Sequence, residues 1–477
     1  MAIPVISVKQ MREWEQATWA SGQTETEVIA HVGKIVAERA LHLTQPGEKI
    51  LILAGKGHNG DDARAALPHL LAREALLLNV IDPQMALEKI RAACRNDQKP
   101  KLILDGLFGI GLSRTLQADW QNLIKLVNDL KIPVLAIDVP SGLDADTGEV
   151  RGAAIRATNT LTLGAPKRGL LKNNAVAFVG RLEVAGEIGL TKFSLASELN
   201  WSARDDYSKF PPAREISSHK GTFGHLVIVA GSPGYHGAAV LATNGALRAQ
   251  PGLVTLFTPE NVYVPVASQL RAAMVNPWHN AREIPKTCSA ILFGPGLAAK
   301  ELSANLRNEL VRLWQESPLP VLVDASALDW IPPGGDFSNR LRVITPHPGE
   351  AARLLGVTSD EVQTDRVVAM RKLSSRFGNC FVVLKGHQTL IGRSAGDILI
   401  NSTGNPFLAQ GGSGDVLAGF LSGLLAQGNL RSDLLKTMGY AVWQHGATAD
   451  ELCVTQPNWT IDDLLVAIGS AVRKQNS

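Results

Sequence analysis

The stretch GNPFLAQGGSGDVLAG, residues 404–419, contains the clearest functional signal of the chain. The glycines of its segment 411–414 let the backbone approach a ligand closely, so that successive amide groups can converge on an anion. The apolar segment 416–425 is typical of a helix, whose N-terminus would face that anion. The carboxylate of Asp415 would repel a phosphate unless it takes up a proton, which favours phosphoryl transfer involving a substrate hydroxyl. The alternative is an ordinary loop-to-helix junction with aspartate at the helix start.

The composition is that of a globular protein with two or three domains. The chain has 477 residues, of which 45% are hydrophobic and 19% charged, and its formal net charge is +3. Because this charge is small and no basic cluster is present, we expect no nucleic-acid partner. The four cysteines lack metal-type spacing, and no segment approaches the roughly 18 apolar residues of a membrane span. We therefore expect a cytoplasmic protein without a signal peptide or a membrane anchor.

Short β-rich segments alternate with helical patterns, which predicts two α/β domains built on parallel sheets. Continuous rather than alternating hydrophobicity indicates strands that are buried on both faces. A weaker region at residues 187–217 contains Pro211-Pro212, so we predict domains at 1–208 and 209–477. The predicted strands are 49–54, 76–81, 101–105, 134–138 and 158–163 in the first domain, and 225–231, 253–258, 290–294, 320–324, 342–345, 380–385 and 397–401 in the second.

The first domain contains a glycine-rich loop, GKGHNG at residues 55–60, between a predicted strand and a predicted helix. It matches the GxGxxG pattern, with Asp82 at the end of the next strand, and so suggests a dinucleotide-binding unit. Against this interpretation, Asp61 and Asp62 place two negative charges at the helix start, where a pyrophosphate would rest. An NAD-dependent dehydrogenase is therefore the least favoured function.

Two further loops of the first domain place acids at strand ends, in DGLFGIGLSR (105–114) and AIDVPSGLDADTG (136–148). In a parallel sheet these loops share the carboxyl edge, where ligands bind. Asp138 is a candidate acid or base, although an aspartate at a strand end also serves as a cap of the next turn. The candidate oxygen ligands of a hard cation are Asn59, Asp105 and Ser141.

These three loops resemble the signature loops of the NAD(P)H-hydrate epimerase family over residues 1–208. The resemblance implies a Rossmann-like fold, a three-layer parallel sheet, which interconverts R and S hydrates of the nicotinamide ring with Asp138 as acid or base. It also implies a potassium ion held by Asn59, Asp105 and Ser141. Asp61 and Ala63 stand where the family has glycines, so an active and an impaired epimerase both remain open. The residues implied to bind the hydrate are His58, Asn59, Gly60, Asp61, Asp62, Gly109, Ile110, Gly111, Leu112, Ser113, Arg114, Thr115 and Asp138.

The second domain contains further loops that follow predicted strands. Two prolines flank His347 and fix its position, which favours contact with a polar ligand over a surface role. Lys385 ends a strand near the expected phosphate site, and its alternative role is that of a lysine reaching water. The motifs are HKGTFG (219–224), GSPGYHGA (231–238), GPGL (294–297), TPHPGEAARLL (345–355) and VLKGHQT (383–389).

Together with residues 404–419, these motifs resemble the ADP- or ATP-dependent NAD(P)H-hydrate dehydratases of the ribokinase-like superfamily over residues 209–477. The resemblance implies that the nucleotide phosphorylates the hydroxyl of the hydrate and that phosphate then leaves, which restores the dihydropyridine. Asp415 would be the catalytic base, and Mg²⁺ would accompany the nucleotide. The implied nucleotide-binding residues are Lys385, Gly386, His387, Gln388, Thr389, Gly411, Gly412, Ser413 and Gly414, and the implied hydrate-binding residues are Ala238, Gly296, His347 and Asp415.

The leading hypothesis is a fused repair enzyme that acts on NAD(P)H hydrates with an adenine nucleotide, Mg²⁺ and K⁺, and family resemblance implies a homo-oligomer. Spontaneous hydration gives both epimers and a stereospecific dehydratase uses one, so the two activities belong together. One alternative is a ribokinase-like kinase of a small hydroxylated metabolite, which the GGSGD segment alone does not exclude. Another is a nucleotide-binding regulatory or scaffold protein, against which the presence of Asp415 argues. The sequence does not decide between ADP and ATP as the nucleotide, or between the hydrates of NADH and NADPH as the substrate.

Overall fold

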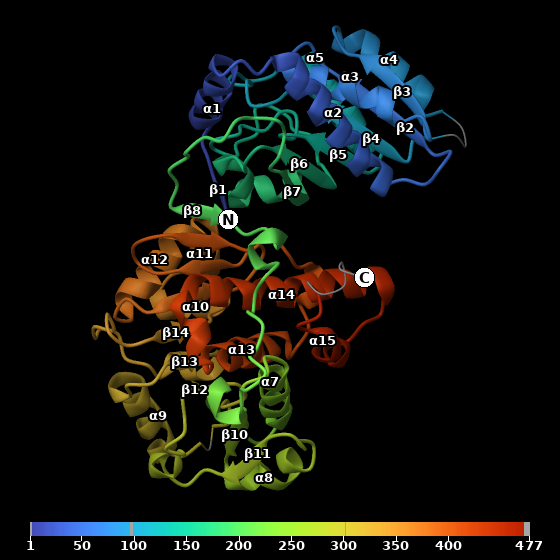
Figure 1. The fold of residues 1–477 in the computed structure, drawn as a ribbon. Helices are drawn as coiled ribbons and strands as arrows, with labels where there is room; N and C mark the ends of the chain where they lie inside the picture. Colours follow the sequence, from blue (N-terminus) through green and yellow to red (C-terminus); the bar gives the residue numbers. More distant parts are fainter. Residues whose placement is uncertain (1, 96–98, 301, 472–477) are drawn as a thin grey trace. The chain divides into compact units, whose positions relative to one another are not determined.

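The computed structural model describes residues 2–95, 99–300 and 302–471, which form two compact α/β units (Figure 1). The first unit spans Ile3–Glu198, and the second continues from Leu199. The predicted boundary after residue 208 differs from this transition, because strand β8 (Leu199–Trp201) pairs in parallel with β17 (Ile398–Ile400) of the second unit. A strand of three residues is too short to show a hydrophobic period. None of the described helices has the length and apolar character that crossing a membrane requires.

The first unit is built on a six-stranded parallel sheet in the order β3-β2-β4-β5-β6-β7. Helices α1 (Val8–Ala20), α2 (Glu25–His42) and α3 (His58–Ala66) cover one face, and α4 (Pro83–Ala93) and α5 (Ala118–Asp129) cover the other. The expected three-layer parallel sheet is confirmed, with β7 as a strand beyond those predicted. The strands are β2 (Lys49–Ala54), β3 (Glu74–Asn79), β4 (Leu102–Gly106), β5 (Val134–Ile137), β6 (Asn159–Leu163) and β7 (Arg181–Ala185).

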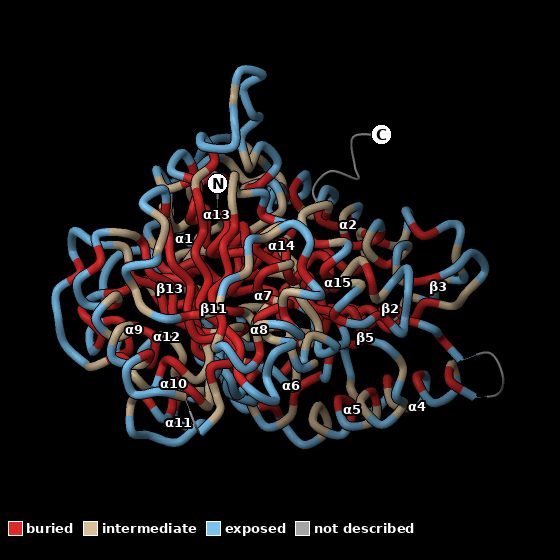
Figure 2. Tube along the Cα trace, turned by 90° about the horizontal axis from the view of Figure 1, so that it is seen from below, coloured by how far each residue is buried: buried red, intermediate tan, exposed pale blue. Residues whose placement is uncertain are grey.

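The continuous hydrophobicity of the strands follows from this double cover. Side chains of a strand point alternately to its two faces. Ile50 and Ile52 therefore join the core beneath α2 and α3, whereas Leu51 and Leu53 join the core beneath α4 and α5. All four are at most 1% exposed. Strands in the interior of both units are accordingly buried along most of their length (Figure 2).

From Leu199 onwards, the strands of the second unit lie in the order β8-β17-β16-β15-β14-β13-β12-β9-β10-β11. Only β16 runs antiparallel to its neighbours among these described strands. Helices α7 (His236–Arg248), α13 (Ser413–Leu425) and α14 (Leu434–Thr455) supply the core that covers one face. The remaining strands are β9 (His225–Val229), β10 (Leu253–Thr258), β11 (Met274–Pro277), β12 (Ala290–Phe293), β13 (Val321–Val323), β14 (Arg342–Ile344), β15 (Phe381–Leu384) and β16 (Leu390–Gly392).

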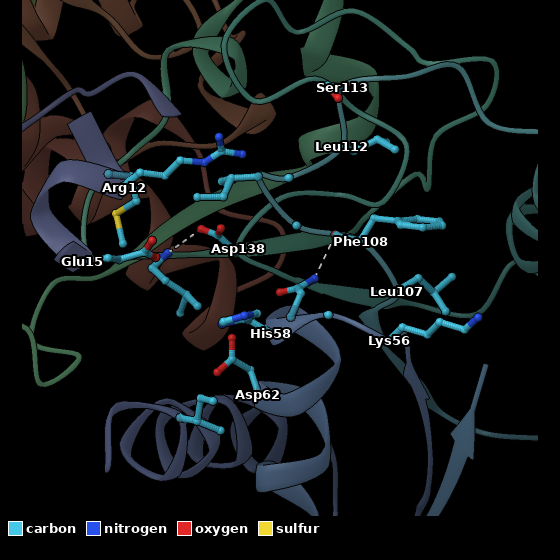
Figure 3. Close-up of a pocket in the computed structure, with 18 of the residues that line it drawn as sticks. Arg12, Glu15, Lys56, His58, Asp62, Leu107, Phe108, Leu112, Ser113 and Asp138 are labelled. Atoms are coloured by element: carbon cyan, nitrogen blue, oxygen red, sulfur yellow. Dashed lines mark hydrogen bonds between the residues drawn. The ribbon is translucent and has the colours of Figure 1, made fainter. Parts of the chain in front are cut away.

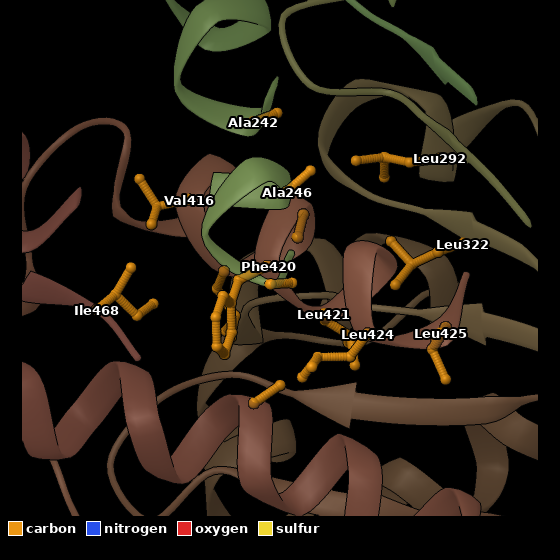
Figure 4. Packing of buried hydrophobic residues seen from close by; sticks show 14 of the residues in the cluster. Ala242, Ala246, Leu292, Leu322, Val416, Phe420, Leu421, Leu424, Leu425 and Ile468 are labelled. Atoms are coloured by element: carbon orange, nitrogen blue, oxygen red, sulfur yellow. The ribbon is translucent and has the colours of Figure 1, made fainter. Parts of the chain in front are cut away.

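Helices α7 and α13 pack with their backbones in close contact (Figure 4). A Cβ atom at Gly419 would lie 1.9 Å from the carbonyl oxygen of Ala242, and one at Gly245 would lie 2.5 Å from that of Val416. Such distances exclude any side chain at these two positions. Gly419 of α13 and Gly245 of α7 thus allow the close packing of the two helices, which positions the GGSGD segment at the N-terminus of α13.

Candidate active sites

A cavity of about 980 Å³ lies in the first unit, at the carboxyl edge of its sheet (Figure 3). The lining residues 56–59 follow β2, 107–115 follow β4, and Asp138 follows β5. The structure therefore brings together most of the residues expected at the hydrate site. Those that line the cavity are His58, Asn59, Asp62, Gly109, Ile110, Gly111, Leu112, Ser113, Arg114, Thr115 and Asp138.

Gly60 and Asp61, which were also expected to bind the hydrate, do not line this cavity. A Cβ atom at Gly60 would lie 2.1 Å from the carbonyl oxygen of Gly55, so the glycine is required by the turn of the loop. The Asp61 carboxylate accepts a hydrogen bond of 2.8 Å from Arg64 on the next turn of α3. The helix thus carries Asp61 outside the cavity lining, and Arg64 pairs its charge, while Asp62, the other expected acid, does line the cavity.

Asp138 is held by three donors that all reach its Oδ1 atom. Lys167 Nζ lies at 2.5 Å, the backbone amide of Leu163 at 3.1 Å and the hydroxyl of Thr162 at 3.2 Å. The Lys167 side chain is fully buried and also donates to the Leu163 carbonyl at 2.7 Å. The φ angle of Asp138 is +63°, a conformation that is rare outside glycine and concentrates at functional sites. These contacts hold the Asp138 carboxyl group in a fixed position at the cavity wall.

Three further carboxyl groups line the same cavity, Glu25 from α2 as well as Glu15 from α1 and Asp62 from α3, which Figure 3 labels. Burial raises the pKa of Glu15, and the charge of Asp138 raises it further. Burial raises the pKa of Asp62 well above its usual range, with repulsion from Asp138 and Asp61 adding to the effect. The cavity thus combines one carboxyl group that hydrogen bonds fix in place with two carboxyl groups whose pKa burial raises.

Sequence reasoning missed Glu15 and Lys167. Helix α1 begins with a capping box between Ser7 and Gln10, a signal that could have located the helix but not its place over the sheet edge. Lys167 follows the predicted strand at 158–163, and no periodicity marks it as buried. Both residues reach the site through tertiary packing, which local patterns do not report.

The three expected cation ligands lie around the backbone of Phe108. The Asn59 side-chain amide donates to the Phe108 carbonyl at 2.9 Å, and the Phe108 amide donates to the Ser141 hydroxyl at 2.8 Å. Ser141 donates in turn to Asp105 Oδ1 at 2.6 Å. Burial raises the pKa of Asp105 to about 6, while hydrogen bonds from Ser141 oppose that rise. Asn59 Oδ1 is buried and has no hydrogen-bond partner within the described ranges, so it is an available ligand for a cation.

In the second unit, Asp415 lies in the first turn of α13 beside the ammonium group of Lys385. Lys385 Nζ is 2.9 Å from Asp324 Oδ1 and 3.9 Å from Glu350 Oε2. A Cβ atom at Gly414 would lie 3.4 Å from the same Nζ, so this cation adjoins the GGSG backbone. Burial raises the pKa of Asp415 to about 7; the charges of Asp324 and Glu350 also raise it, and Lys385 lowers it.

The site around Lys385 and Asp415 can bind an anion and, next to it, accept a proton. Gly412 has a φ of +95° and is the N-cap of α13, so the amides that follow it are at the positive end of the helix. Lys385 adds a full positive charge at that place. A carboxyl with a pKa of about 7 is divided between its two protonation states near neutral pH, which suits a general base.

His445 on α14 contacts the first residue of α13, and the sequence analysis did not predict this contact. Its Nε2 atom lies 3.1 Å from the Ser413 carbonyl oxygen and 3.3 Å from the Ser413 hydroxyl. Burial lowers the pKa of His445 to about 4, so the imidazole is neutral and donates from Nε2 to the carbonyl. This contact fixes Ser413, which lies between Gly412 and Gly414 and two residues before Asp415.

The expected nucleotide loop, residues 385–389, is shaped by a buried guanidinium. Arg366 on α12 (Arg366–Arg376) donates to the carbonyl oxygens of Leu384 at 3.0 Å and Lys385 at 3.2 Å, and also to that of His387. Burial lowers the pKa of Arg366 to about 10, at which it remains charged. Arg366 lies outside the motif, so its role was not visible in the sequence.

His347 is the N-cap of α10 (Pro348–Leu355). Its Nδ1 atom accepts the amide of Gly349 at 3.0 Å and that of Glu350 at 3.3 Å, and its own amide donates to Glu350 Oε2 at 2.8 Å. Since Nδ1 is the acceptor, the proton of the neutral ring is on Nε2. The side chain is 53% exposed, so a ligand can approach that donor.

The two remaining expected contacts to the hydrate lie against each other. A Cβ atom at Gly296, which has a φ of +66°, would lie 2.9 Å from the Ala238 Cβ and 2.5 Å from the Tyr235 carbonyl oxygen. The Ser232 hydroxyl donates to the Gly296 carbonyl at 2.6 Å. The loops after β9 and β12 are therefore locked together at the sheet edge.

Comparisons with known proteins match both units. The family model described as NAD(P)H-hydrate dehydratase matches residues 226–468, and the model described as YjeF-related protein N-terminus matches residues 81–169. A bifunctional NAD(P)H-hydrate repair enzyme of Coxiella burnetii is 32% identical over 93% of this chain and 93% of its own. The enzyme of the same description from Gloeobacter violaceus is 32% identical over 98% of this chain and 97% of its own.

A solved ribokinase-like superfamily protein from Enterococcus faecalis supports the fold. It is 24% identical, covers 60% of this chain and 99% of its own, and has a TM-score of 0.51. The ribokinase-like fold expected from the sequence is thereby confirmed.

Proposed function

The chain belongs to the family of bifunctional NAD(P)H-hydrate repair enzymes, and from this premise we propose how its two units perform the two reactions. The first unit interconverts the R and S hydrates, and the second uses ADP or ATP to convert the S hydrate to NAD(P)H. The observation that carries the second assignment is Asp415, with a pKa of about 7, beside Lys385 at the N-terminus of α13. An anion-binding site and a general base that lie next to each other suit the phosphorylation of a hydroxyl group.

In the proposed dehydration, Asp415 removes the proton of the hydrate's hydroxyl, whose oxygen then forms a bond to the terminal phosphorus. The bond from that phosphorus to the bridging oxygen of the nucleotide breaks. Lys385 and the amides of residues 411–414 stabilise the charge on the transferring group. Mg²⁺ would arrive with the nucleotide and neutralise part of its phosphate charge. His347 offers its Nε2 proton to the bound hydrate.

The second step restores the ring. The bond between the ring carbon and the phosphate oxygen breaks, and phosphate leaves with the electron pair. A proton passes from the adjacent ring carbon to water, and the new double bond gives the dihydropyridine. Because the pKa of Asp415 is about 7, the same residue can return its proton to the departing phosphate and be ready for the next substrate.

In the first unit, we assign proton transfer on the hydrate to Asp138. Inversion at the carbon that carries the hydroxyl requires a bond to this carbon to break and re-form, with a proton moved between heteroatoms. Lys167 keeps Asp138 in place, while burial raises the pKa of Glu15 and of Asp62, which favours the proton-donating form of both groups. The cavity of about 980 Å³ has room for a large part of a dinucleotide.

We also assign a potassium ion to the loop around Phe108, a proposal supported by the unpartnered Oδ1 of Asn59 and the buried carboxylate of Asp105. Oxygen donors of this kind suit a hard cation. When bound, K⁺ would supply fixed positive charge beneath the loop 107–115. Asn59, Asp105 and Ser141 would hold it, and the Ser141 hydroxyl also donates a hydrogen bond to Asp105.

The dehydratase assignment is tested with purified protein, S hydrate, Mg²⁺ and either nucleotide, by following the absorbance of restored dihydronicotinamide. We expect recovery only with nucleotide, one phosphate released for each molecule restored, and loss of about a hundredfold or more in Asp415→Asn, because it removes the general base. Asp138→Asn is the matched control and should retain recovery from the S hydrate. Accumulation of a stable phosphorylated product would instead favour a kinase, and recovery without nucleotide would contradict the proposal.

A further inference from the structure

The segment 402–412 leads from the end of strand β17 to the start of helix α13. It contains the first part of the motif at residues 404–419, and its last residues begin the backbone that is proposed to hold the transferring phosphoryl group. The contacts that hold this segment therefore determine where the amides of residues 411–414 and the carboxyl group of Asp415 lie.

The start of this segment packs directly on the backbone of α14. A Cβ atom at Gly446 would lie 2.5 Å from the hydroxyl oxygen of Thr403 and 2.8 Å from the amide nitrogen of Gly404. The Thr403 hydroxyl also donates to the carbonyl oxygen of Trp443 at 2.8 Å. Because no side chain fits between them, the helix and the segment are in close contact at this point.

Asp450, one turn further along α14, accepts two hydrogen bonds from the segment. Its Oδ2 atom accepts the amide of Gly404 at 3.1 Å, and its Oδ1 atom accepts the side-chain amide of Asn405 at 2.9 Å. Each carboxyl oxygen thus holds a different one of two neighbouring residues. The pair of hydrogen bonds fixes the orientation of the segment on the helix as well as its position.

A series of hydrogen bonds continues from Asn405 to the glycines. The Asn405 Oδ1 atom accepts the amide of Phe407 at 3.0 Å and so caps the short turn at residues 406–408. The Phe407 carbonyl accepts the side-chain amide of Gln410 at 2.8 Å, and the Gln410 carbonyl accepts the amide of Ser413 at 3.3 Å. The segment is therefore hydrogen-bonded from its start to the first residue of α13.

Helix α14 holds both ends of this series. Asp450 contacts the Gly404 end, and His445 contacts Ser413 at the other end. A rise of about 1.5 Å per residue places Asp450 and His445 roughly 7–8 Å apart along the axis of the same helix. One rigid element thus sets the distance between the two ends of the segment.

We propose that Asp450 is a positioning residue of the dehydratase, which places the amides of residues 411–414 and Asp415 through the segment 402–412. The proposal rests on the dehydratase function given above. The Asp450 carboxyl group acts through Asn405 and the turn that follows it, rather than on either reactant. A displacement of about 1 Å in a reacting group can lower a rate about a hundredfold, so these contacts contribute to kcat.

The test measures kcat and the KM for the nucleotide in the dehydration of the S hydrate. In Asp450→Ala we expect kcat to fall about ten- to a hundredfold, because the segment is no longer held at Gly404. The KM for the nucleotide should change less than about threefold, since Arg366 holds the loop 385–389. Asp450→Asn keeps the size of the side chain and one acceptor oxygen, so it should give a smaller fall and serves where the alanine variant is unstable.

Two further readouts separate positioning from a general loss of structure. The charges that shift the pKa of Asp415 come from Asp324, Lys385 and Glu350, so the pH profile of kcat should keep its midpoint in Asp450→Ala. The double variant with Asn405→Ala should be no slower than the slower single variant, because both residues act through the same hydrogen bond.

Asp433→Ala is the matched control, since Asp433 caps the opposite end of α14 by accepting the amide of Lys436 at 2.9 Å. It should leave kcat unchanged. An equal fall of kcat in Asp433→Ala and Asp450→Ala would show that only the stability of α14 matters and would overturn the proposal. Unchanged kcat in both Asp450 variants, or losses that multiply in the double variant, would also overturn it.

The same measurements distinguish the failure of this proposal from the failure of the dehydratase function. If the unsubstituted protein shows no nucleotide-dependent recovery, the dehydratase function itself fails. If the unsubstituted protein recovers the dihydronicotinamide and Asp450→Ala does so at the same rate, only the positioning role of Asp450 fails.

Discussion

Both sites of this chain place several carboxyl groups around one lysine, and they differ in what adjoins that lysine. In the second unit Asp415, Asp324 and Glu350 lie around Lys385, which adjoins the glycine-rich backbone at the N-terminus of α13. In the first unit Lys167 pairs with Asp138, and Glu15, Glu25 and Asp62 line the same cavity. Phosphoryl transfer needs a positive site for the anion, whereas moving protons on a hydrate needs several carboxyl groups with different proton affinities. The glycine-rich backbone beside Lys385 therefore distinguishes the two sites more clearly than the charges of their side chains do.

Lys167→Met should have the largest effect, because it leaves the Asp138 carboxylate buried without its cation. Breaking a buried ion pair in this way costs about 3–5 kcal/mol. We expect faster amide hydrogen exchange in β5 and β6 and loss of epimerisation, with normal dehydration of the S hydrate. Lys172→Met, an exposed lysine nearby in the sequence, is the control. Unaltered exchange and epimerisation in Lys167→Met would mean that the ion pair is not needed at that site.

Lys385→Met should lower kcat/KM of the dehydratase about a hundred- to a thousandfold, the range for removal of a donor that stabilises transferring charge. Because Lys385 lowers the pKa of Asp415, its removal raises that pKa, and the residual activity should shift its pH profile upwards. A pH series of initial rates measures both effects. The exposed Lys372→Met serves as control. A lower rate with an unshifted profile would contradict the coupling of the two residues.

The pKa of Asp415 also predicts a change of stability with pH. The folded-state pKa is raised from 3.8 to about 7, so the stability that this group contributes is fully present below about pH 4 and is lost as the pH rises through 7. Asp415→Asn removes this dependence. We expect the variant to be more stable than the unsubstituted protein at pH 8 and similar to it at pH 4. Denaturant unfolding followed by hydrogen exchange in α13 measures the difference, and lower stability of the variant at pH 8 would argue against a raised pKa.

Asp61→Gly should have the smallest effect. Asp61 lies outside the cavity and pairs with Arg64 at the surface, and such pairs contribute about 0–1 kcal/mol. Epimerase activity should therefore change less than about twofold, whereas an impairment caused by Asp61 would be relieved by restoring glycine. A large gain of epimerisation in Asp61→Gly would show that the charge does reach the ligand. This experiment tests whether Asp61 itself impairs the epimerase.

How much of the molecule the sequence predicts depends on whether a feature is local. The strands that precede the glycine-rich loops, and the placement of Asp415 at a helix start, follow from local hydrophobicity and glycine pattern. Glu15, Lys167, Arg366 and His445 reach the sites from elements distant in the sequence, and no local pattern marks them. The sequence also did not predict that Asp61 lies outside the cavity, because it shows that the residue is charged but not which way its side chain points.

The most direct test of the account is a progress curve with mixed R and S hydrates, nucleotide, Mg²⁺ and K⁺. We predict complete recovery of dihydronicotinamide in two phases, with the second phase faster than spontaneous epimerisation and absent in Asp138→Asn. Recovery that stops at the S fraction in the unsubstituted protein would contradict the proposed work of the first unit, and absence of any nucleotide-dependent recovery would contradict the account as a whole.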